Sequence, residues 1–234
     1  MLSLSFPDLP YASLAAMTFA FYAFASALDV SRRAAGIAAV LLAATPFVLV
    51  FWMPIDALYI IRDLAAHGVA YAWPSAIMIA SLACFARGFR IVSWILAAGA
   101  LQLNALALAL PVIVMTLAFF YTPDRRRIED AWRASFPYWL IAAAYTAISF
   151  PFEIHIESWQ AGALPLAAAW VAAALLSDRF REILIVTFAM FGAPFLIMIL
   201  TGIAKESYFP ATGICLMVGV LIDDALTRVL SREA

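Results

Sequence analysis

The chain has 234 residues, a net charge of −1 and two cysteines, so it offers neither a basic field for nucleic acid nor a disulfide framework. Hydrophobic residues make up 67% of the chain and charged residues 12%, with a mean hydropathy of +1.00. These values exclude an ordinary soluble domain and predict an all-α, polytopic membrane bundle that occupies residues 1–234 as a single transmembrane domain. Thirteen arginines against one lysine, with abundant alanine, are typical of a GC-rich genome and favour a bacterial inner membrane.

The chain is a series of apolar segments separated by short polar connections. The first, 11–30, has no basic region before it and is interpreted as a retained span, not a cleaved signal peptide. Seven of the segments predict full bilayer crossings, and the longest, 91–121, predicts a hairpin. The remaining segments are 34–53, 71–86, 91–121, 136–152, 159–177, 183–204 and 208–226.

Residues 54–70 differ from these segments because their polarity alternates at helical spacing. At about 100° per residue, Ile55 and Leu58 share one face of a helix. Asp63 and His67 share the opposite face. This pattern predicts one interfacial helix that lies on the outer membrane surface with its apolar face down.

The stretch 91–121 has no charged side chain, and its length decides the predicted topology. As one helix, its thirty-one residues would be about 46 Å long, against a hydrocarbon core of about 30 Å. Arginines flank it on both sides, so a helical hairpin would return both clusters to one side of the membrane. Each leg would be only about 21 Å long, which predicts a short or re-entrant hairpin with its tip near Gln102 and Asn104.

The hairpin also gives the better distribution of basic residues. It gathers twelve of the fourteen on one side, whereas a single long span gives nine against five at best. The positive-inside rule then predicts an outer N-terminus and a cytoplasmic C-terminus. The predicted cytoplasmic residues are Arg32, Arg33, Arg87, Arg90, Arg125, Arg126, Arg127, Arg133, Arg179, Arg181, Arg228 and Arg232.

Four polar side chains in or near spans are candidates for a substrate or ion pathway. Gln102 and Asn104 offer hydrogen bonds at the hairpin tip, and Asp223 and Asp224 are ionisable groups near the inner end of the last span. A structural interpretation stays open for both pairs. Amides join membrane helices by hydrogen bonds, and Asp224 lies four residues before Arg228, a spacing at which ion pairs form.

Both histidines fall on the predicted outer side, where several carboxylates accompany them. Asp63 and His67 are spaced i, i+4, and Glu153, His155 and Glu157 project to one face of an extended segment. Imidazole and carboxylate groups bind zinc and other divalent ions, so these five residues form a candidate metal site. The alternative is a pair of solvated acidic loops, because the spacing matches no established metal motif.

No catalytic signature occurs, and three classes of function remain open. The hairpin, the prolines in apolar segments and the aspartate pair favour a small multi-pass transporter or channel for a small solute or ion. The near absence of polar loops fits a noncatalytic subunit or assembly factor of a larger membrane complex. The outer histidines and carboxylates fit a membrane enzyme that acts on a lipid-linked substrate. The expected partners are the lipid bilayer and either a membrane protein or a second copy of the chain; nucleic acid is not expected, and no cofactor is identified.

Overall fold

The computed structural model describes residues 10–28, 30–52, 73–121, 128–149, 180–201 and 209–231, together with positions 168, 170 and 172. All regular structure in these ranges is helical, which confirms the predicted all-α class. None of the helices in these ranges combines the length and the apolar composition that a bilayer crossing requires. The predicted interfacial helix, 54–70, lies outside the described residues, as does most of the predicted span 159–177.

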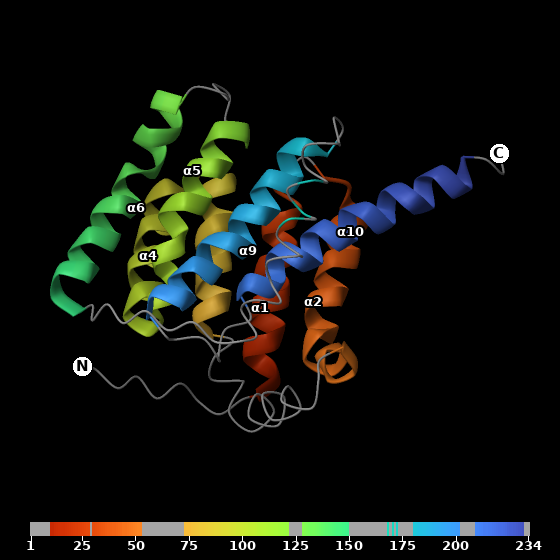
Figure 1. The fold of residues 1–234 in the computed structure, drawn as a ribbon, viewed down its shortest axis with the longest axis horizontal. Helices are drawn as coiled ribbons and strands as arrows, with labels where there is room; N and C mark the ends of the chain where they lie inside the picture. The colour runs from red at the N-terminus through yellow and green to blue at the C-terminus, as the bar shows by residue number, and fades with distance from the viewer. Residues whose placement is uncertain are drawn as a thin grey trace.

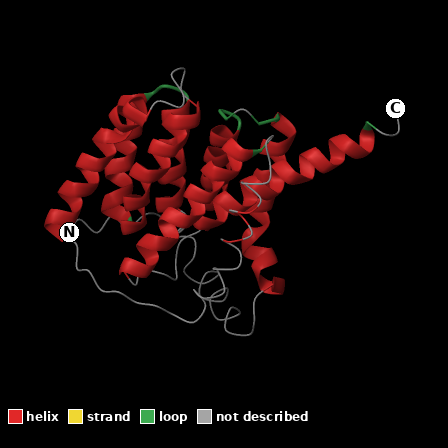
Figure 2. Cartoon of the chain, turned by 45° about the horizontal axis from the view of Figure 1, so that its top comes forward, coloured by secondary structure: helices red, strands yellow, loops and turns green. Residues whose placement is uncertain are grey.

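The helices form one bundle, in which most axes run up or down the view of Figure 1. Residues 73–86 are also helical. The last turns of α10 extend beyond the neighbouring helices (Figures 1 and 2), and residues 225–231 are exposed. In chain order the named helices are α1 (Pro10–Ala25), α2 (Arg32–Trp52), α4 (Arg90–Leu103), the 3₁₀ helix η1 (Ala105–Ala109), α5 (Leu110–Tyr121), α6 (Ile128–Ser149), α9 (Arg181–Thr201) and α10 (Phe209–Leu230).

The connection between α1 and α2 is set by side chains that bond to the main chain at the helix ends. Helix α1 ends at Ala25, five residues before the end of the predicted segment, and its Ala23 carbonyl accepts from the Ser26 hydroxyl at 3.1 Å. Helix α2 begins after Ser31, whose hydroxyl oxygen accepts from the Ala34 N–H at 2.9 Å. This is an N-cap, and it satisfies one of the donors that the first turn of a helix leaves free.

Helix α6 begins eight residues before the apolar segment that predicted it. Its first turn contains Glu129 and Asp130, which suit the positive end of the helix dipole. Glu129 also accepts from Arg133 at 2.5 Å across one turn. A search for apolar runs does not detect these two turns, because charged residues interrupt their apolar residues, although Ala131 and Ser135 are buried.

The core is made of close helix–helix contacts. Helix α10 packs against α2 and α9, α5 packs against α6, and α9 covers η1. Two glycines on α10 allow the closest approaches: a Cβ at Gly213 would lie 2.5 Å from the Thr187 carbonyl oxygen, and one at Gly219 would lie 2.8 Å from the Ala38 Cβ. Small residues at such positions let helix backbones approach closely, as in membrane bundles.

Candidate functional site

The long charge-free stretch is broken at the predicted place. Helix α4 ends at Leu103, and Asn104 has an extended backbone with φ −154° and ψ 126°. The Asn104 N–H still donates to the Ala100 carbonyl at 2.8 Å, while its side-chain oxygen accepts from the Leu106 N–H at 2.8 Å. Asn104 therefore ends α4 and caps η1 within the stretch 91–121.

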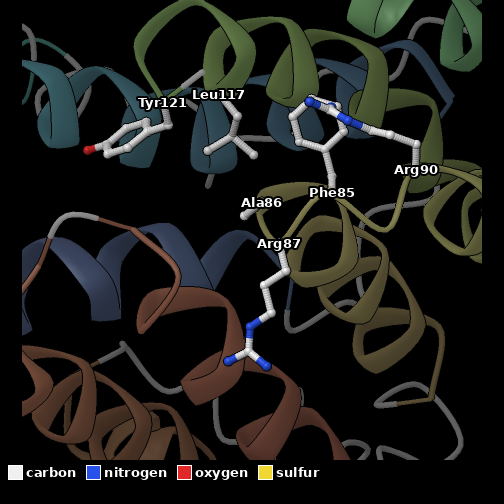
Figure 3. A pocket seen from close by; sticks show the side chains of 7 residues that line it. Phe85, Ala86, Arg87, Arg90, Leu117 and Tyr121 are labelled. Carbon is white, nitrogen blue, oxygen red and sulfur yellow. The ribbon is translucent and has the colours of Figure 1, made fainter. Parts of the chain in front are cut away.

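The two legs of the broken stretch return to the same end of the bundle. Arg90, at the start of α4, and Tyr121, at the end of α5, line one cavity (Figure 3). The chain therefore reverses between them, as the hairpin prediction requires. Of the two tip amides, Gln102 is exposed and Asn104 is partly buried with its side chain used as a cap.

Asp223 is engaged in a network that joins α2 to α10. Its carboxylate accepts from the Ser31 hydroxyl at 2.6 Å and forms an ion pair with Arg33. The same guanidinium donates to the Thr227 hydroxyl at 2.7 Å. Asp224 forms the predicted ion pair with Arg228, at 2.7 Å. Both aspartates are thus held in ion pairs, and their role in a substrate or ion pathway stays a prediction.

We expect Arg33 and Asp223 to be energetically coupled. A double-mutant cycle of Arg33→Ala and Asp223→Ala, read by thermal unfolding in detergent, should give a coupling free energy of about 1 kcal/mol. The Arg33 side chain is 46% exposed, so solvent screens the pair, although Asp223 is only 15% exposed. A coupling indistinguishable from zero would contradict the ion pair as a contributor to stability.

The candidate metal ligands lie outside the described part of the chain. This holds for Asp63, His67, Glu153, His155 and Glu157, so the metal hypothesis stays a prediction. Among the described residues, no group of three or more His, Cys, Asp or Glu side chains is arranged to hold a metal ion.

A buried hydroxyl cluster, not foreseen from the sequence, joins the helix over 73–86 to α4 and α6. Ser81 and Ser93 each donate to the other's carbonyl, at 2.8 and 2.6 Å. The Tyr138 hydroxyl lies 2.5 Å from the Ser93 hydroxyl, and all three side chains are buried. Donating from Tyr138 to Ser93 satisfies every hydroxyl in the cluster, which removes the cost of burying them.

Next to this cluster a tight turn brings two arginines together. Gly88 has φ +85°, a left-handed conformation that glycine adopts without steric cost, and it separates the helix over 73–86 from α4. The Arg87 guanidinium points toward α1, where it donates to the Ala23 carbonyl at 3.1 Å and the Ser26 hydroxyl at 3.3 Å (Figure 3). Arg87 therefore supplies a cation at the negative end of α1.

The Arg90 side chain points away from the Arg87 side chain. Its guanidinium carbon lies 3.8 Å from the centre of the Phe85 ring, a cation–π contact, and its Nη1 is buried without a hydrogen-bond partner among the described residues (Figure 3). Burial lowers the pKa of Arg90, and the nearby Tyr138 partly opposes that shift. Among the described residues, Arg90 therefore has no ion-pair partner.

The cavity beside these arginines has a volume of about 270 Å³. We call this end of the bundle the arginine end, defined by the start of α2, the turn at 87–89, the start of α4 and the end of α5. The cavity is lined by Phe85, Ala86, Arg87, Gly88, Arg90, Leu117 and Tyr121. Among these described residues, the two arginines are the charged groups.

No protein-family model, curated protein or solved structure matches this chain.

Proposed function

We propose that the chain is a polytopic membrane protein of the bacterial inner membrane and works as a small transporter or channel. Support for the membrane location comes first from its outer surface. Large apolar side chains lie exposed on several helices, including Phe19 (75%), Val40 (68%) and Ile95 (66%). Exposure on this scale is unfavourable in water but matches a lipid environment.

The distribution of arginines supports the proposed orientation. Arg33, Arg87 and Arg90 lie at the arginine end. Helix α6, with Arg133 in its second turn, and α9, with Arg181 in its first, also begin at that end in Figure 1. By the positive-inside rule, the end of a membrane bundle that is enriched in arginine faces the cytoplasm. The proposal therefore has the N-terminus outside and the C-terminus in the cytoplasm.

The buried break between α4 and α5 is the observation that carries the transport function. The α-helical backbone is interrupted by the extended Asn104 and the short 3₁₀ helix η1, yet Ala105, Leu106 and Ala109 are buried and α9 packs on η1. At membrane depth, non-helical backbone is tolerated where protein buries it or where it lines a water-filled path, and broken helices are common at transporter sites. α9 also contains Pro194, which removes another helical hydrogen bond.

The transport proposal is tested in proteoliposomes. Purified protein would be exposed to gradients of H⁺, Na⁺, K⁺, chloride and phosphate, with flux read from internal dyes and ion-selective electrodes. Gln102→Ala should abolish any flux without reducing thermal stability, because Gln102 is exposed and caps nothing. The matched control is Gly99→Ala, three residues earlier in a position with open space. Flux unchanged by Gln102→Ala would contradict a role for the hairpin tip.

A noncatalytic subunit or assembly factor is the second candidate. It is favoured by the ion pairs that occupy Asp223 and Asp224, because charges held this way serve stability better than conduction. Native mass spectrometry of tagged protein, gently extracted from its own membrane, separates the two. A stoichiometric protein partner supports the subunit; a lone chain or homo-oligomer with a bound ion or small molecule supports the transporter.

The enzyme alternative depends on outer loops that lie outside the described residues. It predicts that His155→Ala abolishes activity on a lipid-linked substrate while the protein stays folded. The metal hypothesis predicts that the double change at His67 and His155 removes zinc or another divalent ion from the purified chain. Stoichiometric metal that survives the double change would contradict it.

A further inference from the structure

The cavity at the arginine end has the character of a binding site for an anion. Arg87 is already bonded to α1, so its charge is partly used there. Arg90 stacks on the face of Phe85 and lies near Tyr138, and its Nη1 has no hydrogen-bond partner among the described residues. None of the described residues that line the cavity is acidic, so none of them neutralises the guanidinium.

We propose that this cavity binds a phosphate-type oxyanion, with Arg90 as its principal charge. A guanidinium presents donors in a planar fork that matches the oxygens of a phosphate and stays charged when partly buried. The volume of about 270 Å³ suits a phosphate with its immediate substituents and is below the usual range for a larger organic ligand.

Two kinds of ligand carry such a phosphate group: an anionic phospholipid and free inorganic phosphate. Leu117 and the ring of Tyr121 lie across the cavity from Arg87 (Figure 3), and their apolar surface suits the glycerol and first acyl carbons of an anionic phospholipid. The lipid source rests on the proposed membrane location of the chain. Binding of free inorganic phosphate does not depend on the membrane location, because phosphate would reach the cavity from solution whether or not the chain lies in a membrane.

Binding is measured on the full chain in neutral detergent, with no transport required. The probes are phosphatidylglycerol, phosphatidylcholine with matched acyl chains, and inorganic phosphate with sulfate as comparison. Arg90→Gln should weaken binding of the effective probe at least about tenfold, and Arg90→Lys should weaken it less because the charge remains. Arg133→Gln is the matched control, because Arg133 is exposed, paired with Glu129 and not part of the cavity wall.

Each outcome decides the proposal. Preference for phosphatidylglycerol over phosphatidylcholine identifies a lipid headgroup, and saturable binding of phosphate alone identifies the free ion. No binding of either to the unmodified chain, or equal losses in Arg90→Gln and Arg133→Gln, would overturn the site. If Arg90→Gln does not fold, Ala86→Met provides a second test, because it fills part of the cavity and keeps both arginines. A failed transport assay leaves this result unaffected.

Discussion

Replacement of Gly219 by leucine should prevent stable folding. A Cβ at this position would lie 2.8 Å from the Ala38 Cβ and 2.9 Å from both the Ala34 carbonyl oxygen and the Ala38 nitrogen. Two of these atoms belong to the backbone of α2, so no side-chain rotation relieves the clash, and the helices α2 and α10 must separate. Because overpacking of a well-packed core costs 1–3 kcal/mol or more, we expect a loss of about 3 kcal/mol or greater.

The measurement is thermal unfolding in detergent with a thiol-reactive fluorogenic dye. Cys215 is buried on α10 and becomes reactive when α10 leaves the core. Gly36→Ala on α2 and Gly99→Ala on α4 are matched controls: each has open space around the new Cβ, and alanine favours a helix by about 1 kcal/mol over glycine. An unfolding temperature of Gly219→Leu equal to that of the controls would contradict the close packing of α2 and α10.

Replacement of Tyr138 by alanine is the second change with a large expected effect. The side chain is 1% exposed, its ring packs edge-on against Phe85 at 5.9 Å, and its hydroxyl completes the cluster with Ser93. Loss of the ring leaves a cavity where the helix over 73–86, α4 and α6 meet. By analogy with buried aromatic residues, we expect a cost of about 3–5 kcal/mol.

Tyr138→Phe separates the ring from its hydroxyl. It keeps the packing and removes one partner of Ser93, which still has the Ser81 carbonyl at 2.6 Å. We therefore expect a smaller cost, of about 1 kcal/mol. Unfolding curves of the two variants, compared under identical detergent conditions, test this order. A Tyr138→Phe variant as unstable as Tyr138→Ala would mean that the hydroxyl network, and not the ring, holds the three helices together.

Features that depend on segment length, charge and local residue spacing could be predicted from the sequence. A charge-free stretch too long for one crossing, with Gln102 and Asn104 near its centre, predicted a break, and α4 ends at Leu103. Four-residue spacing predicted the ion pair of Asp224 with Arg228. These are properties of single segments, for which neighbours in sequence are also neighbours in space.

Features that join distant segments were not predictable in the same way. Arg33 and Asp223 lie 190 residues apart in the sequence, and no local pattern indicates that they meet. Ser81 and Ser93 are unremarkable residues in apolar segments until the turn at Gly88 brings them together. The cavity beside Arg90 requires the end of α5 as its far wall, so it exists only once the hairpin has formed.

The most direct test of the proposed topology is to determine which side of the membrane each end of the bundle faces. Single cysteines would replace Arg32, Phe89, Ser231 and Glu157 in a chain with Cys84 and Cys215 changed to alanine, and a membrane-impermeant maleimide would be applied to sealed vesicles of known orientation. Positions 32, 89 and 231 should react only from the cytoplasmic side, and position 157, in a predicted outer loop, only from the opposite side. Reaction of positions 32 and 89 from opposite sides, or recovery of the chain outside the membrane fraction, would contradict the proposed topology.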